Sequence, residues 1–210
     1  YISTVDSGNM AGHLLTLKQG LFFLGECPVI NPRIFLGLKD TLDVLQEKTD
    51  SDALFQSFSG ELLSAVSREW QDITGILDQL QKLLISAEAL LPSLSSSPEA
   101  AWWGEALLKQ IREALSDLYE TAPWLMLNAF PPDFQNLKQM IPRNMSLNEL
   151  FALEMSVLPV LHDLAENDLT DEEKKWLEGL RRQVIETVRR AKERLLTIQA
   201  LMKSCDEFAD

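Results

Sequence analysis

The chain has 210 residues, of which 46% are apolar and 24% are charged, ordinary values for a globular protein with a buried core. Its 19 basic and 32 acidic residues give a formal net charge of −13 at pH 7. Because binding to a phosphate backbone or an anionic membrane surface depends on Lys and Arg, this balance argues against nucleic acid as a partner and against membrane contact. No apolar run approaches the roughly 20 residues that a membrane-spanning helix needs.

Residues 1–20 are predicted to form a short extended lead-in followed by a helix. Asp6 or Thr4 is placed to cap the first free N–H groups of this helix. Its apolar stripe consists of Leu14, Leu17 and Leu21.

Two glycines, Gly8 and Gly12, lie one turn apart in this predicted helix. Each costs about 1 kcal/mol relative to Ala inside a helix, so the pair predicts a face that another helix or a ligand approaches closely. Polar side chains of three kinds stand beside that face, namely Asp6, Asn9 and His13.

Residues 20–32 contain Gly25, Pro28 and Pro32 and are predicted to be a turn-rich passage. The apolar run Phe22–Leu24 is expected to pack there as a small plug. A helix is predicted from Pro32 to about Glu47, and the polar link after it ends in acids that suit a helix cap.

Apolar residues then step by threes and fours from Leu63 to Leu91, which predicts one long helix ended by Pro92. The next helix is predicted over 98–121, with Ser97 as its cap and a proline at its first position. The irregular apolar segment 124–134 is expected to fold back onto a neighbour, because surface loops seldom carry so much hydrophobic area.

Two capping boxes, Ser146–Glu149 and Thr170–Glu173, predict the last two long helices. Pro159 is expected to kink the first of them, near Met155. No alternating run rich in Val, Ile and Thr is present. The sequence therefore predicts an all-α fold, an antiparallel helical bundle of long helices with no sheet.

Few residues point to catalysis or metal binding. His13 and His162 are the histidines, Cys27 and Cys205 stand far apart, and no metal-binding, nucleophile or phosphate-loop motif occurs. His162 is interpreted as a helix-end histidine beside the helix dipole, and the cysteines as free thiols. No metal site is predicted.

Sugars stack on aromatic faces, so the five tryptophans are candidates for carbohydrate contact. Trp70, Trp103 and Trp176 fall on the apolar stripes of predicted helices and are interpreted as core residues. The remaining two, Trp102 and Trp124, are the carbohydrate or interface candidates, with interface packing the better reading.

The run from Tyr1 to Leu15, Tyr-Ile-Ser-Thr-Val-Asp-Ser-Gly-Asn-Met-Ala-Gly-His-Leu-Leu, closely resembles a signature of bacterial cyclic β-1,2-glucan synthases. The resemblance is specific over about the first twenty residues. In that family the signature lies in a central glucoamylase-like region with an (α/α) barrel fold. The resemblance, with a first residue other than Met, implies that residues 1–20 belong to this region of a longer parent and that 21–210 form a helical bundle insert.

The resemblance also implies a candidate glucan site at the start of the chain. Glycoside chemistry generally needs two carboxylates, and Asp6 is the candidate for one of them, with its partner supplied from outside this segment. Ser7, Gly8 and Asn9 would form the adjoining substrate-binding wall. The parent would take glucose from a sugar nucleotide donor, and no cofactor is expected in this segment.

Two interpretations of the whole chain stay open. In the first, it is a structural segment of an inner-membrane enzyme that builds and cyclises β-1,2-glucan. It would lie on the cytoplasmic side, contact the rest of the parent and a glucan oligosaccharide, and be inactive alone. In the second, it is an autonomous helical protein-interaction module without enzymatic activity. Asp6 itself is interpreted either as a helix cap or as a glucan-site carboxylate.

Overall fold

The computed structural model describes residues 4–49, 52–70, 72–127, 131–141 and 145–209, without the side chains of 4–7, 133 and 138. Over these residues the chain forms the helices α1 (Thr4–Glu26), α2 (Ile34–Gln46), α3 (Ala53–Ser67), α4 (Ile73–Leu90), η1 (Leu91–Ser96), α5 (Pro98–Thr121), η2 (Pro123–Met126), η3 (Pro132–Phe134), α6 (Gln135–Met140), α7 (Leu147–Ser156), α8 (Leu158–Ala165) and α9 (Asp171–Ala209). This part of the chain contains no strand, only one isolated bridge between Pro28 and Ser146. The predicted all-α fold without a sheet is confirmed.

The chain divides into two compact units. One unit, Ile30–Leu125, contains the helices α2 to α5. The other joins Tyr1–Val29 to Met126–Asp210 and therefore brings together segments from both ends of the sequence. Residue 20, where we expected the motif-bearing segment to end, lies inside α1.

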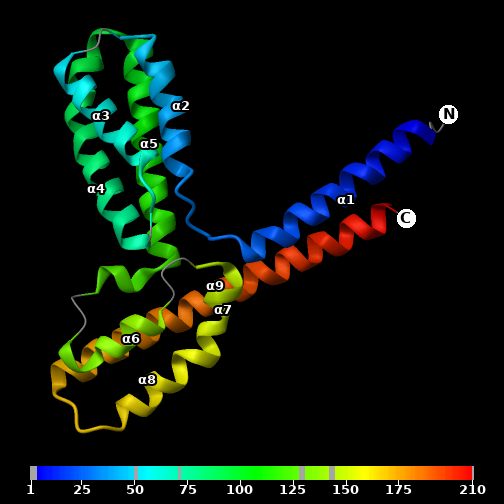
Figure 1. The fold of residues 1–210 in the computed structure, drawn as a ribbon, viewed down its shortest axis with the longest axis vertical. Helices are drawn as coiled ribbons and strands as arrows, with labels where there is room; N and C mark the ends of the chain where they lie inside the picture. Colours follow the sequence, from blue (N-terminus) through cyan, green and yellow to red (C-terminus); the bar gives the residue numbers. More distant parts are fainter. Residues whose placement is uncertain (1–3, 50–51, 71, 128–130, 142–144, 210) are drawn as a thin grey trace. The chain divides into compact units, whose positions relative to one another are not determined.

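The unit Ile30–Leu125 is a four-helix bundle (Figure 1). Each helix packs against two others, α2 on α3 and α5, and α4 on α3 and α5, so the four close a ring around a common core. The largest fully buried side chains of this core are Phe35, Phe55, Phe58, Leu38, Leu45, Leu62, Leu80, Leu83, Leu90, Leu94 and Leu107. The bundle thus buries an apolar core of its own.

The single long helix predicted up to Leu91 is wrong, because the chain breaks between α3 and α4. Asp72 caps α4, with its Oδ1 accepting from the N–H of Gly75 at 2.9 Å. Trp70, expected on a helical stripe, lies in the break, where its indole N–H donates to the carbonyl of Ala65 and its ring stacks on Phe35. The apolar spacing continues across the break, so it gives no sign that one helix has become two antiparallel ones.

Local signals at the helix ends of the bundle are confirmed. Asp52 accepts from the N–H of Phe55 at 2.7 Å at the start of α3, and Ser97 accepts from Ala100 at the start of α5. Gly104 of α5 is buried under η1, where an added Cβ would lie 2.5 Å from Leu94 Cδ1. Any larger residue at this close approach would require the Leu94 side chain to shift.

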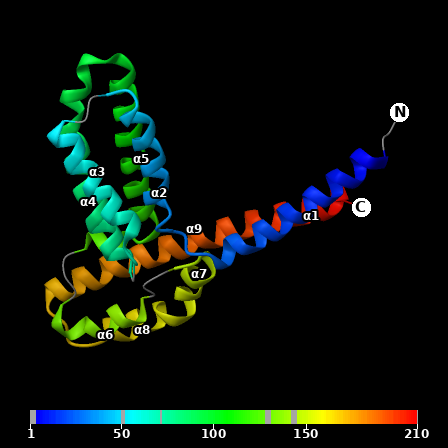
Figure 2. The same cartoon turned by 45° about the horizontal axis from the view of Figure 1, so that its top comes forward.

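The second unit is organised along α9, a helix of 39 residues that is about 58 Å long at the usual rise per residue. Helices α7 and α8 pack on the first half of α9, and α1 packs along its second half (Figures 1 and 2). Both predicted capping boxes are present, at Ser146–Glu149 and at Thr170–Glu173. Pro159 follows a break at Val157 between α7 and α8, which confirms the interruption predicted near Met155.

The turn-rich passage predicted from Gly20 begins later than expected, because α1 continues through Gly20 and Gly25 to Glu26. The apolar plug predicted at Phe22–Leu24 is also wrong, since all three side chains are more than half exposed. A helical glycine costs only about 1 kcal/mol, and packing of α1 along α9 outweighs that cost.

Candidate functional site

The predicted glucan-site residues lie together in the first two turns of α1. The side chains of Asp6 and Ser7 lie outside the described residues. Gly8 and Asn9 are exposed, and nothing lies within 4 Å of a Cβ built on Gly8. His13, one turn further on, is exposed as well. At Gly8, Asn9 and His13 this face of α1 is therefore exposed in the described part of the chain.

Helix α1 includes Thr4 and Asp6, the two residues expected to cap it, and the side chains of both lie outside the described residues. An acid in the first turn of a helix interacts favourably with the helix dipole.

The close approach predicted for the small-residue face is not made by any of the described residues. A Cβ built on Gly12 meets nothing within 4 Å, just as at Gly8. By contrast, the helical glycines Gly25 and Gly104 do meet neighbouring side chains at 3.4 Å or less. The face that carries Gly8 and Gly12 has no neighbour among the described residues.

The two tryptophans proposed for carbohydrate or interface contact differ in exposure. Trp102 on α5 is 60% exposed and meets Trp103 edge to face, with ring centroids 4.7 Å apart. Trp124 is only 4% exposed, so its interpretation as a carbohydrate aromatic is wrong. Trp124 and Phe134, at the two ends of the irregular apolar segment, are buried, whereas Met126 is 68% exposed and residues 128–130 lie outside the described part of the chain.

The described residues hold little else that could carry out chemistry. Among them no group of three or more His, Cys, Asp or Glu side chains is arranged to hold a metal ion. His162 is exposed in the last turn of α8, with Nε2 3.9 Å from Glu166 Oε1, in agreement with its interpretation as a helix-end residue. Cys27 and Cys205 are free thiols, exposed and buried respectively.

The most distinctive feature of the second unit is the antiparallel pair formed by α1 and the second half of α9 (Figure 2). The least exposed residues of α1 repeat at helical spacing and are Ala11, Leu14, Lys18, Leu21 and Gly25. Lys18 donates to both carboxylate oxygens of Asp206 at 2.6 and 2.7 Å, and Gly25 lies against Leu195. These contacts fix the face that each helix turns toward the other.

Apolar side chains flank this contact face and remain exposed. On α1 they lie at seven-residue spacing on one flank, Met10, Leu17 and Leu24, and on the other, Leu15 and Phe22. On α9, Leu201 and Phe208 have the same spacing and are also exposed. Of the 23 residues in α1 only Asp6, Lys18 and Glu26 are of the types Asp, Glu, Lys or Arg. A helix with apolar residues on several sides and so few charges is typical of a buried helix.

A cavity of about 510 Å³ lies where α1 ends against α9 and α7. Its lining residues are Leu24, Cys27, Pro28, Val29, Leu147, Arg190, Glu193, Arg194, Thr197 and Ile198. The size falls within the usual range for ligand pockets, and the lining is mostly apolar with charged groups contributed by α9.

Hydrogen bonds join the segment at the start of α7 to the segment at the end of α1, beside this cavity. Asn148 donates to Glu26 Oε1 at 2.6 Å, and the N–H of Val29 donates to the carbonyl of Met145 at 2.8 Å. The capping box at Ser146 begins α7 at the same point. The local signal that starts α7 therefore also helps to position one wall of the cavity.

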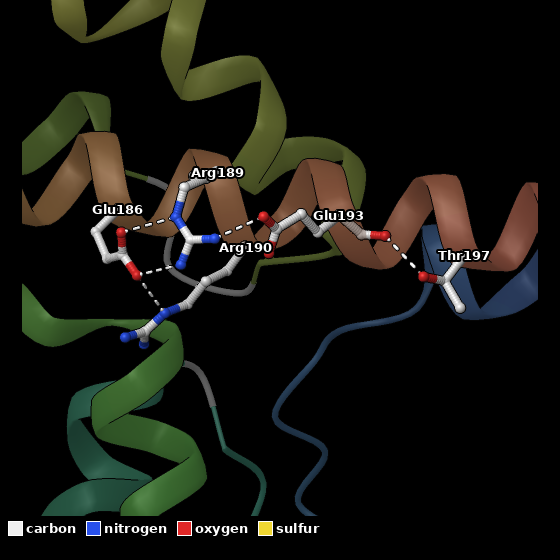
Figure 3. Close-up of polar contacts among 5 residues, drawn as sticks. All are labelled: Glu186, Arg189, Arg190, Glu193 and Thr197. Atoms are coloured by element: carbon white, nitrogen blue, oxygen red, sulfur yellow. Dashed lines mark hydrogen bonds and ion pairs between the residues drawn. The ribbon is translucent and has the colours of Figure 1, made fainter.

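Charged side chains of α9 form an ion-pair network beside the cavity (Figure 3). Arg189 lies between two carboxylates, with Nη2 2.7 Å from Glu186 and Nη1 2.6 Å from Glu193, while Arg190 Nε donates to Glu186 at 2.9 Å. Hydrogen bonds from Arg189, and then from Arg190, lower the pKa of Glu186 to about 2. The pairs are solvent-exposed and spaced three or four residues apart, so they stabilise the surface of a helix and do not form a reaction centre.

Sequence reasoning missed the cavity and the flanking stripes. The signal was present as the seven-residue repeats of Met10, Leu17 and Leu24 and of Leu201 and Phe208. Only the pairing of α1 with α9 reveals that the two repeats belong to one surface.

Comparison of the chain with protein-family models and with curated proteins gives no match.

Proposed function

We propose that residues 1–210 form a helical segment of a cyclic β-1,2-glucan synthase and border its glucan-processing region. The parent enzyme would polymerise glucose from a sugar nucleotide donor and close the product into rings. The segment would contribute structure, and one edge of the glucan site through Asp6, Ser7, Gly8 and Asn9. The observation that carries the proposal is the likeness of residues 1–15 to the signature of that family.

The open surface of α1 supports the proposal. Gly8 and Asn9 are exposed, and the built Cβ positions of Gly8 and Gly12 have free space around them. A sugar ring or a neighbouring helix could therefore approach the backbone at these positions without displacing any described residue. Asn9 would then hydrogen-bond sugar hydroxyls, as its amide donates and accepts.

The arrangement of α1 and α9 also suits a segment inserted into a larger fold. The Thr4 end of α1 and the Ala209 end of α9 lie at the same end of the antiparallel pair, with α1 extending beyond α9 (Figures 1 and 2). Chain ends on one side of a unit are compatible with insertion into a host fold. The four-helix bundle Ile30–Leu125 would then be carried as a self-contained addition.

The test is Asp6→Asn in the longer polypeptide, with cyclic glucan output and melting temperature measured on the same preparation. Asn keeps the size and polarity of the side chain but removes its charge. Loss of a first-turn acid costs only about 0.3–1 kcal/mol of stability, whereas loss of a catalytic carboxylate lowers the rate by roughly 10² to 10⁴. Normal output at normal stability would reduce Asp6 to a structural residue.

A second candidate function is an autonomous helical module that binds a partner protein. The exposed apolar side chains of α1 and α9 favour it, because such patches mark interaction surfaces. The coding sequence on both sides of residues 1–210 separates the candidates. A reading frame that continues in both directions, with membrane-spanning segments upstream, supports the glucan synthase; start and stop signals at these ends support the module.

A further inference from the structure

The cavity of about 510 Å³ at the end of α1 lies within one compact unit, because the residues that line it all belong to Tyr1–Val29 or Met126–Asp210. Its walls differ in chemistry. The end of α1, the segment after it and the start of α7 supply apolar side chains, namely Leu24, Pro28, Val29 and Leu147. Helix α9 supplies Ile198 and the polar side chains of Arg190, Glu193, Arg194 and Thr197. A cavity that combines apolar walls with a few polar groups fits a small amphipathic ligand.

The apolar walls of the cavity favour an aliphatic ligand over a sugar. None of the described lining residues is aromatic, so the cavity offers no ring face on which a sugar could stack. Aliphatic walls bind a ligand by removing its methylene groups from water, which is worth about fourfold in affinity for each methylene that becomes buried. The body of the ligand is therefore an alkyl chain.

Charge on α9 selects the head group of the ligand. Arg190 donates through Nε to Glu186 at 2.9 Å, and Glu193 lies 2.6 Å from Arg189, so each of these two lining residues already has a partner of opposite charge (Figure 3). Arg194 is exposed, and no hydrogen bond or ion pair joins it to any residue that the structure describes. Its guanidinium matches the two oxygens of a carboxylate.

The number of charges separates a carboxylate from a phosphate. One guanidinium balances one negative charge, whereas a phosphate monoester carries nearly two at pH 7. The carboxylate of Glu193 lines the same cavity, and the chain has a net charge of −13, so a second negative charge on the ligand would be repelled. A head group with a single negative charge fits best.

We propose that this cavity binds an aliphatic carboxylate of medium chain length. The carboxylate pairs with Arg194, and the alkyl chain lies against Leu24, Val29 and Leu147. The site is separate from the candidate glucan residues at the start of α1 and does not depend on their role.

A native thiol reports on occupation of the cavity. Cys27 is exposed and lines the cavity, whereas Cys205 is buried and is not among the lining residues. In the 210-residue chain, decanoate below its micelle concentration should slow the reaction of Cys27 with maleimide and should do so saturably. Mass spectrometry assigns the label to each thiol, and Cys205 should stay unreactive, which excludes unfolding by the probe.

Related probes separate the head group from the alkyl chain. Decanoate should protect Cys27 more strongly than decanol, and decyltrimethylammonium should protect it least. Octanoate and hexanoate should bind more weakly than decanoate, by up to about fourfold for each methylene removed. Protection by decyltrimethylammonium equal to that by decanoate overturns the assignment of a carboxylate. No protection by any of these probes overturns the site.

Neutralising Arg194 tests the ion pair. Arg194→Gln should weaken the binding of decanoate about three- to fivefold, the modest effect of an exposed ion pair, and should leave the binding of decanol unchanged. Lys192→Gln is the matched control, because Lys192 is exposed and does not line the cavity. Equal affinity for decanoate in the two variants overturns the pairing with Arg194.

Filling the cavity tests its position. Thr197→Trp places a large side chain at an exposed lining position and should abolish the protection of Cys27 by decanoate. Leu196→Trp, at the neighbouring exposed position outside the lining, should leave protection intact. Circular dichroism should show the same helix content in both variants. Protection that survives in Thr197→Trp overturns the proposal, because decanoate would then bind elsewhere.

Discussion

The four-helix bundle and the α1–α9 pair differ in how far they bury their phenylalanine side chains. In the bundle, four helices close a ring, and Phe35, Phe55 and Phe58 are at most 2% exposed. In the pair, two helices share one contact face, and Phe22, Phe23 and Phe208 are more than half exposed. Residues of the same type therefore stabilise one region and remain available to partners in the other.

Geometry explains this difference. A helix in a closed four-helix ring has neighbours on two sides, which together cover an apolar stripe of ordinary width. A helix in a pair has one neighbour, so apolar residues on its flanks stay exposed unless another element covers them. The bundle thus buries a core of its own, while apolar side chains on the flanks of α1 and α9 have no cover among the described residues.

Replacing one phenylalanine by alanine in each region should give the largest difference between the bundle and the α1–α9 pair. Phe58→Ala removes a fully buried ring from the bundle core and should lower the free energy of unfolding by about 3–5 kcal/mol. Phe22→Ala removes a ring that is 52% exposed and should change it by no more than about 0.5 kcal/mol. Urea unfolding of the 210-residue chain measures both. A large loss for Phe22→Ala would mean that the pair is already buried.

Glycine-to-alanine substitutions in the two regions should give the next largest difference in stability. In Gly104→Ala the added Cβ would lie 2.5 Å from Leu94 Cδ1 and 3.1 Å from Leu91 Cδ2, and relieving such overlap costs about 1–3 kcal/mol. In Gly12→Ala the Cβ meets nothing, and the better helix propensity of Ala should stabilise the chain by about 1 kcal/mol. Thermal unfolding should move in opposite directions for the two variants. Equal shifts would contradict the open face assigned to α1.

Loss of a helix cap tests how the inner end of α1 is held. Ser146→Ala removes both the N-cap of α7 and the reciprocal capping box with Glu149, and should cost about 1 kcal/mol. Hydrogen exchange should then accelerate in α7 and at the end of α1, which Asn148 contacts through Glu26, and not in the bundle. Acceleration spread evenly over both units would show that they unfold as one.

The smallest expected effect is the pH dependence of stability that comes from the ion-pair network of α9. The folded-state pKa of Glu186, about 2, lies below the usual 4.5. Its contribution to stability is therefore fully present above about pH 4.5 and is lost as the pH falls toward 2. An NMR titration should show this low pKa, and Arg189→Ala should raise it toward its usual value, because Arg189 is the main cause of the shift. An unchanged pKa in the variant would exclude the pairing with Arg189.

Features set by neighbouring residues could be predicted from the sequence. Capping boxes at Ser146 and Thr170, the cap at Ser97 and the interruption before Pro159 all depend on side chains within a few positions of the helix end. Such contacts are complete within one short segment, so their pattern predicts them directly.

Features set by distant parts of the chain could not be predicted in the same way. At the break between α3 and α4, Trp70 stacks on Phe35 of another helix, a contact that hydrophobic spacing does not reveal. Burial of Trp124 and exposure of Phe22 depend on which elements lie next to them, which hydrophobic spacing does not reveal. For the glucan site, the resemblance singles out Asp6 to Asn9, and the test of their role needs the longer polypeptide.

Hydrogen exchange of the 210-residue chain, resolved along the sequence, tests most directly whether the bundle, with its own buried core, is better protected than the pair. The buried amides of α2 to α5 should exchange only with opening free energies near that of global unfolding. Amides of α1, particularly those before Gly20, should exchange much faster, because α1 has one covered face. Uniform protection from α1 through the bundle would contradict this account.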